Sequence, residues 1–340
     1  MTGLFVRSRV PHEAARDGDS GRRVGAFLGG GPTSFDRADA MERWLGVGFD
    51  VQTVFEPWDA DPGGVTDQFD RLTAIWDAGR TPLVTWEAYT PTPAATPVDV
   101  LQRILDGVYD EYVDRWGRAL AEWVAGPDGT LGTDDDRQLL LRPLHEPNGD
   151  WYPWAPAASG AEPALYARVW RRLHRRVNQA GATGDRVDWI WAVNHVDAGD
   201  VPAESLFPGD DVVDLLGVDG FNWGATRAWS EWQPPAAVFG EMLARVRSVS
   251  QRPVCIPEFG CTTATLGGLD PQRKGKWLWE AFSHFTDQDV VLAAYFDVEK
   301  ETDWQVFGGS CGANTIRIDG TRYQTYPGFR RGVRTFSASG

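Results

Sequence analysis

The sequence predicts an α/β protein built as a single (β/α)8 TIM barrel. Short apolar runs alternate along the chain with segments whose apolar residues recur at helical spacing. Eight such runs occur in 340 residues, an ordinary length for one such barrel. Gly29-Gly-Gly-Pro32 lacks both the GxGxxG spacing and a following Lys-Ser/Thr, so the phosphate loop typical of doubly wound open sheets is missing.

The eight apolar runs have the length of buried parallel strands, and the segments between them have helical periodicity. The predicted strands are residues 24–28, 49–55, 82–86, 139–144, 187–193, 212–218, 253–257 and 290–296. The predicted helices are residues 37–45, 65–78, 98–124, 163–180, 236–248 and 271–285, with a short helix near 202–206 and a last one at 326–336.

The chain divides into a polar N-terminal tail, residues 1–22, and one domain, residues 23–340, without an internal repeat or linker. The tail has no long apolar run, so neither a signal peptide nor a transmembrane helix is predicted. Two locations stay open: secretion, with the signal removed or missing from this sequence, and the cytoplasm.

The composition narrows the class of partner. A net charge of -15 argues against nucleic acid and anionic membrane surfaces, which both favour basic patches. A neutral substrate fits better, and we expect a monomer. Seventeen tryptophans exceed what core packing usually recruits, which suggests surfaces that stack on sugar rings.

The cysteines and histidines show no metal-ligand spacing, so we expect no metal and no cofactor. Cys255 lies within a predicted strand. Cys261 follows that strand and Cys311 lies in the last long loop, which leaves a disulfide between these two open.

Two glutamates stand at the ends of predicted strands. Glu146 follows residues 139–144 and precedes an aromatic turn, and Glu258 follows residues 253–257 and precedes Phe259-Gly260. In such barrels the chemistry lies at the carboxyl ends of the strands. Two carboxyl groups converging from strands four and seven, about 5 Å apart, are what retaining glycoside hydrolysis requires.

These residues resemble those of glycoside hydrolase family 26, over about residues 23–335. His145-Glu146, with Asn148-Gly149 and Trp151, resembles the acid/base motif of that family. Residues 208–224 resemble its strand-six signature, and Asp303-Trp304 its strand-eight platform. The resemblance implies a (β/α)8 barrel of the clan with catalytic glutamates on strands four and seven.

One position departs from the family pattern. The family usually carries a tyrosine on strand six whose hydroxyl can bond the nucleophile, and this chain has Phe221. The orientation of the nucleophile must then be set by another donor, and Arg142 and Asn194 are the candidates.

The roles follow from charge. Glu146 is predicted to be the general acid and base in an apolar surround of Trp151 and Trp154, and Glu258 the nucleophile. Trp304 is predicted to form the floor under the cleaved sugar. The predicted substrate-binding residues are His145, Trp151, Trp154, Asn194, Phe221, Asn222, Trp223, Trp304 and Trp86.

The sequence thus predicts a retaining endo-β-glycosidase acting on a polysaccharide. The resemblance puts β-1,4-mannan and glucomannan first, then mixed-linkage β-1,3-1,4-glucan, then β-1,3-xylan. The alternative from another class is a barrel that has lost catalysis and only binds glycans through its aromatic rings.

Overall fold

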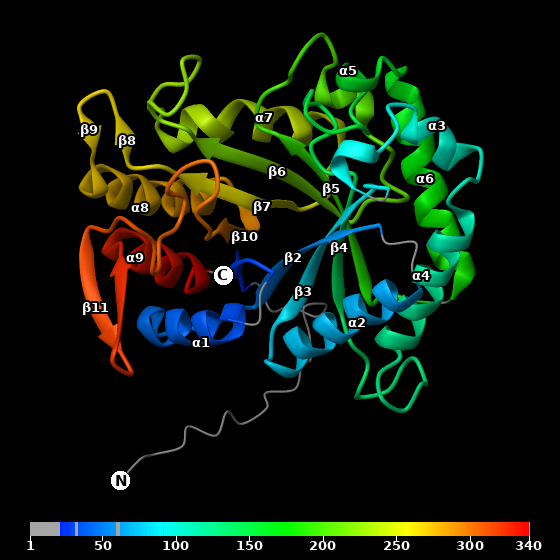
Figure 1. Ribbon diagram of the computed structural model, residues 1–340, viewed down its shortest axis with the longest axis horizontal. Coiled ribbons are helices and arrows are strands. Elements are labelled where there is room, and N and C mark those ends of the chain that lie inside the picture. Colours follow the sequence, from blue (N-terminus) through cyan, green and yellow to red (C-terminus); the bar gives the residue numbers. More distant parts are fainter. Residues whose placement is uncertain (1–20, 31–32, 59–61, 91, 182, 340) are drawn as a thin grey trace.

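The computed structural model describes residues 21–30, 33–58, 62–90, 92–181 and 183–339. Eight parallel strands form a closed barrel in the order β1-β10-β7-β6-β5-β4-β3-β2, and helices surround it (Figure 1). The barrel strands are β1 (Arg23–Phe27), β2 (Val51–Pro57), β3 (Thr81–Glu87), β4 (Leu139–Pro143), β5 (Val187–Asn194), β6 (Leu215–Asn222), β7 (Val254–Cys261) and β10 (Val290–Phe296). The predicted (β/α)8 class is confirmed.

The helices alternate with these strands along the chain. They are α1 (Thr33–Leu45), α2 (Pro62–Asp77), α3 (Val100–Leu105), α4 (Asp110–Val124), α5 (Pro156–Ser159), α6 (Pro163–Ala180), α7 (Pro235–Val249), α8 (Pro271–Asp287) and α9 (Pro327–Ser337). Short 3₁₀ turns, η1 (Pro93–Ala95) and η2 (Ala203–Leu206), and two hairpins, β8 (Ala264–Thr265) with β9 (Gly268–Leu269) and β11 (Asn314–Ile318) with β12 (Thr321–Thr325), complete the fold.

The barrel strands are buried on both faces because their side chains point alternately into the lumen and toward the helices. Seven of the eight barrel strands contribute a residue to one compact apolar layer that fills the lumen. That layer consists of Val51, Leu83, Leu140, Ile190, Ala192, Leu215, Cys255 and Leu292. It supports, from below, the polar residues at the carboxyl ends of the strands.

The helices cover the barrel with apolar stripes. In α6 the buried residues Tyr166, Val169, Trp170, Leu173 and Val177 recur at three- and four-residue spacing, which places them on one face. Helices α2, α4, α7 and α8 bury comparable stripes, so the large tryptophan content serves packing to a greater extent than the sequence suggested.

Some element bounds differ from the prediction. Residues 98–124 form two helices, because Gly107 adopts a left-handed φ of 86° that ends α3 before α4 begins. The positive φ favours glycine at this position, and a Cβ there would also lie 2.8 Å from the Asp110 carboxylate. Strand β6 begins three residues later than predicted, and β7 continues to Cys261.

Of the predicted tail, residues 1–20 lie outside the described residues. Arg22, at its end, donates a hydrogen bond of 2.6 Å to the carbonyl of Ser339 near the C-terminus. None of the helices in the described ranges is long and apolar enough to cross a membrane. All three cysteines are free, so the Cys261–Cys311 disulfide left open by the sequence is absent; the buried Cys261 thiol donates instead to the carbonyl of Thr262.

Candidate active site

The segment that carries Glu146 leaves β4 in an unusual backbone conformation. Leu144 has φ 49° and Glu146 has φ 50°, in the left-handed region that non-glycine residues rarely adopt. Such conformations cost free energy and persist only where the surroundings hold them, which is common at functional sites.

Tertiary hydrogen bonds hold this segment in place. The Tyr166 hydroxyl donates to the carbonyl of Leu144 at 3.0 Å, and the Trp154 indole donates to the carbonyl of His145 at 2.8 Å. The amide of Glu146 donates to the carbonyl of Ala192 on β5 at 2.9 Å. The carboxyl group therefore projects from a backbone fixed by α6, the aromatic turn and the neighbouring strand.

Both oxygens of the Glu146 carboxyl group accept hydrogen bonds. Asn194, the last residue of β5, donates its amide to Oε1 at 2.8 Å, and the Trp151 indole donates to Oε2 at 2.8 Å. Burial, and then the negative charge of Glu258, raise the pKa of Glu146 to about 7, although both donors oppose the rise. Glu146 is thus poised to give and take a proton near neutral pH.

Glu258 lies within β7 rather than after it. The register of β7 shifts against both of its neighbours, between Gly217 and Gly220 on β6 and between Ala293 and Tyr295 on β10. Such an irregularity re-aims side chains, and Glu258 projects into the barrel beside Arg142.

Arg142 holds Glu258 from the centre of the lumen. Its guanidinium is fully buried and donates to Glu258 Oε2 at 2.8 Å, to Asp219 on β6 at 2.7 Å, and to the Thr85 hydroxyl on β3. A guanidinium stays charged, so this contact is a charge-assisted hydrogen bond that fixes the orientation of the Glu258 carboxyl group. Arg142, one of the two donors considered from the sequence, is the one that contacts Glu258; Asn194 contacts Glu146 instead.

His145 is buried, and Nε2 of its ring lies 2.8 Å from the Tyr152 hydroxyl. Burial and the nearby charge of Arg142 lower the pKa of His145 well below its ordinary value, so the ring is neutral. Its Nδ1 has no partner among the described residues. Tyr152, which contacts both His145 and the stacked ring of Trp154, was missed from the sequence although it lies in the same aromatic turn.

Three of the predicted substrate-binding residues face the protein instead. Trp86 is 0% exposed because β3 turns Thr85 inward and hence Trp86 outward, where it packs on Trp116 of α4. Trp154 is also 0% exposed and clamps the Glu146 segment. Asn222 is buried, and its amide group bonds backbone amides and Cys261.

The predicted sugar floor, Trp304, is covered in this structure. It is 1% exposed, and its ring packs on Phe221 at 5.0 Å and on Trp223 at 4.9 Å between centroids. Phe221 pairs with Gly260 in the β6–β7 ladder, and both rings lie over Gly260, two residues beyond Glu258. The accessible aromatic surface is therefore offered by the half-buried Phe221 and Trp223.

Two further tryptophans are open to solvent near the carboxyl ends of the strands. Trp151, beside Glu146, is 46% exposed, and Trp229, in the loop after β6, is 72% exposed. Trp229 lies against Trp223 with ring centroids 5.6 Å apart. Trp223 and Trp229 thus form a continuous aromatic surface.

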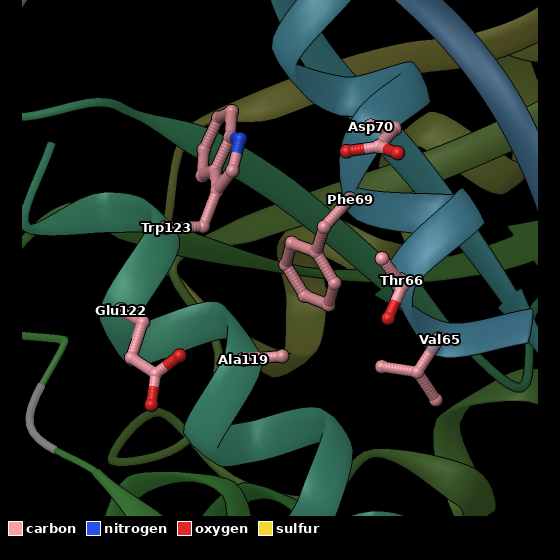
Figure 2. Close-up of a pocket in the computed structure, with 7 residues that line it drawn as sticks. All are labelled: Val65, Thr66, Phe69, Asp70, Ala119, Glu122 and Trp123. Atoms are coloured by element: carbon pink, nitrogen blue, oxygen red, sulfur yellow. The ribbon is translucent and has the colours of Figure 1, made fainter. Parts of the chain in front are cut away.

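Other features of the described residues lie outside this site. No group of three or more His, Cys, Asp or Glu side chains in the described ranges is placed to hold a metal ion. A hollow of about 300 Å³ lies between α2 and α4 on the outer surface (Figure 2). Its lining residues are Val65, Thr66, Phe69, Asp70, Ala119, Glu122 and Trp123, and none of them belongs to the site.

Comparison with known proteins places the chain in a family. Residues 66–246 match the model of glycosyl hydrolase family 26. Endoglucanase H of Acetivibrio thermocellus is 30% identical over 294 residues, which are 85% of this chain and 29% of that protein. The chain belongs to glycosyl hydrolase family 26. The resemblance stated from the motifs is confirmed.

Other relatives of this family 26 chain are named for different enzymatic activities. The β-1,3-xylanase TXYA of a Vibrio species is 26% identical, over 77% of this chain and 58% of that protein. The catalytic domain of an endo-β-1,4-mannanase from Bacillus sp. JAMB-750 has the same fold, with a TM-score of 0.62 and 13% identity over 92% of this chain and 86% of that one. The chain spans less than two thirds of the length of both curated relatives.

Proposed function

We propose that this barrel is a retaining endo-β-glycoside hydrolase acting on a neutral polysaccharide, with Glu146 as general acid and base and Glu258 as nucleophile. The observation that carries the proposal is the unequal environment of the two carboxyl groups. Burial and Glu258 raise the pKa of Glu146 to about 7, whereas the Arg142 guanidinium binds the Glu258 carboxylate. Such a division supports one acid and one nucleophile.

The two steps follow from these environments. In the first, a Glu258 oxygen attacks the anomeric carbon, the bond to the leaving oxygen breaks, and Glu146 gives that oxygen its proton. In the second, the Glu146 carboxylate takes a proton from water, whose oxygen attacks the same carbon and releases Glu258. Arg142 orients Glu258, while Asn194 and Trp151 orient Glu146.

We propose β-1,4-mannan or glucomannan as the first substrate, with Trp223, Phe221 and Trp151 as the stacking surfaces. Mixed-linkage β-glucan is the second candidate, because the match to an endoglucanase covers 85% of the chain, whereas a mannan endo-1,4-β-mannosidase of Thermothelomyces thermophilus matches 42% of it. We also propose that the protein is secreted, because such polymers are too large to enter a cell.

The test is a substrate panel of soluble β-1,4-mannan, glucomannan, mixed-linkage β-glucan and β-1,3-xylan. We expect new reducing ends and an early fall in viscosity on at least one polymer, with the β-anomer formed first in the NMR spectrum. Binding without release of reducing ends would favour the competing class, a glycan-binding barrel. Initial formation of the α-anomer would contradict the retaining mechanism.

A further inference from the structure

A third carboxyl group, that of Glu87, points into the same mouth. Glu87 is the last residue of β3, two residues after Thr85, whose hydroxyl accepts hydrogen bonds from Arg142 in the lumen. Leu83, two residues earlier still, belongs to the apolar layer inside the barrel. Because alternate residues of a strand share a face, Leu83, Thr85 and Glu87 form one inward row that ends at the mouth.

The electrostatics agree with this placement. Burial, and then the negative charge of Glu258, raise the pKa of Glu87 to about 7. Tyr152, which contacts His145, is also within electrostatic reach of Glu87, Glu146 and Glu258. The three carboxyl groups therefore all lie within electrostatic reach of one tyrosine of the aromatic turn.

Glu87 differs from the other carboxyl groups of this region in having no partner. Glu146 accepts from Asn194 and Trp151, and Glu258 accepts from Arg142. No described residue donates a hydrogen bond to the Glu87 carboxyl group or forms an ion pair with it. Glu87 is half-buried and stays accessible from the mouth of the barrel. A carboxyl group partly removed from water without a protein partner is open to a partner supplied by a ligand.

We propose that Glu87 binds substrate, accepting hydrogen bonds from a pair of free hydroxyl groups on a neutral sugar unit next to the cleaved bond. Above its pKa of about 7, Glu87 is a carboxylate whose two oxygens suit two neighbouring donors. It repels a carboxylated sugar at the same place. The inference rests on the proposed function, and it makes Glu87 a determinant of specificity in addition to the acid and the nucleophile.

The experiment compares Glu87→Gln with Glu56→Gln. Glu56 is the matched control because it is the residue before the last one of the neighbouring strand β2, but its carboxyl group is buried and accepts two hydrogen bonds from Arg71 of α2. Binding of a neutral oligosaccharide is measured by calorimetry, and kcat/KM is measured on the best polymer of the panel and on its carboxymethylated form. Thermal midpoints report on folding.

We expect Glu87→Gln to weaken binding and kcat/KM roughly 10- to 100-fold, the range for a charge-assisted hydrogen bond, with an unchanged or higher thermal midpoint. Its preference for the neutral over the carboxymethylated polymer should narrow severalfold. Glu56→Gln should lower the thermal midpoint. It should leave oligosaccharide binding, kcat/KM and the preference for the neutral polymer unchanged.

The outcomes separate the two proposals. Binding and kcat/KM of Glu87→Gln within twofold of wild type, in a protein that cleaves the panel, overturn the role of Glu87 alone. A wild-type protein that binds oligosaccharide but cleaves nothing overturns the catalytic proposal. The role of Glu87 is then tested by the calorimetric binding of Glu87→Gln alone. Absence of both binding and cleavage overturns both.

Discussion

At the scale of single residues, the acid strength of Glu146 depends on two donors that act against burial. The Trp151 indole, 2.8 Å from Oε2, lowers the pKa of Glu146, while burial and Glu258 raise it. Removing the indole N–H should therefore move this pKa upward, because the carboxylate form loses a hydrogen bond that the neutral form needs less.

Trp151→Phe tests this directly. The general acid must be protonated, so its loss of a proton sets the alkaline limb of the pH profile of kcat/KM. That limb should lie near pH 7 in the wild type and about 0.5–1 unit higher in Trp151→Phe. Trp229→Phe is the control, since Trp229 is exposed and donates no hydrogen bond to Glu146. A coincident limb in all three proteins would contradict the acid assignment.

The nucleophile is tested by Glu258→Ala. Turnover should fall by about 10⁴-fold or more, because without the nucleophile the covalent glycosyl-enzyme cannot form. Azide should restore turnover by attacking the vacant face, and the product should be the inverted glycosyl azide. Failure of azide to rescue a folded variant would assign the nucleophile to another residue.

The position of Glu146 and Glu258 at the same end of the barrel could be predicted because each follows an apolar run, and barrel topology brings strand ends together; their catalytic roles stay a prediction. The roles of Trp86 and Trp154 could not be predicted. Every residue of β3 from Thr81 to Trp86 is buried, so the sequence shows no alternation that tells the lumen face from the helix face. The indole of Trp154 is used by a backbone carbonyl, a partner that no local pattern reveals.

At the scale of elements, the loop after β10 is anchored from outside the barrel by α8. Lys274, near the start of α8, is fully buried, and its Nζ donates to the carbonyls of Asp303, Trp304 and Gln305. This loop carries Trp304, which packs on Phe221 over Gly260. A buried lysine on a helix thus positions part of the mouth.

Lys274→Met should destabilise the protein by about 2–4 kcal/mol, because the carbonyls of Asp303 and Gln305 lose the Lys274 donor, while that of Trp304 keeps the hydrogen bond from the Tyr295 hydroxyl. The fluorescence of the tryptophans near the mouth should change as the loop loosens. Lys276→Met is the matched control, since Lys276 lies on the same helix but is exposed and pairs with Glu280 at 3.3 Å. Equal unfolding free energies for both variants would show that the anchor contributes nothing.

Element bounds were predicted well where a cap or a proline marks them, as at Pro163–Ala180. They were missed where backbone geometry decides. The glycine at 107 ends α3 inside a continuous apolar periodicity, and the register shift of β7 lets Glu258 point inward from within the strand. Neither depends on hydrophobic pattern, so periodicity alone could not locate them.

At the scale of the whole molecule, the carboxyl groups at the mouth of the barrel lower the stability of the fold. Glu87 and Glu146 are held close to Glu258 in a chain of net charge -15, and burial and that neighbour raise the pKa of each to about 7. Carboxyl groups in such an environment are retained for function at a cost in stability.

The direction in which the free energy of unfolding changes with pH follows from the number of protons that the folded and unfolded chains bind. Between the ordinary carboxyl pKa of 4.5 and about 7, the folded protein keeps protons on Glu87 and Glu146 that the unfolded chain releases. The free energy of unfolding should therefore fall as pH rises through this window, by on the order of 3 kcal/mol for each group. The contribution of these two groups to the free energy of unfolding should be greatest near the lower end of this pH window.

The double variant Glu87→Gln/Glu146→Gln isolates this contribution, because it removes both titrations and leaves the remaining charges in place. We expect its unfolding free energy, from urea denaturation at pH 5 to 8, to fall less steeply than the wild-type value, because only the other buried carboxyl groups with a raised pKa, such as Glu56, still titrate. At pH 8 the variant should be the more stable protein, and at pH 5 the two should be nearly equal. Parallel curves for the two proteins across this range would mean that neither carboxyl group is buried against Glu258 in the way the structure indicates.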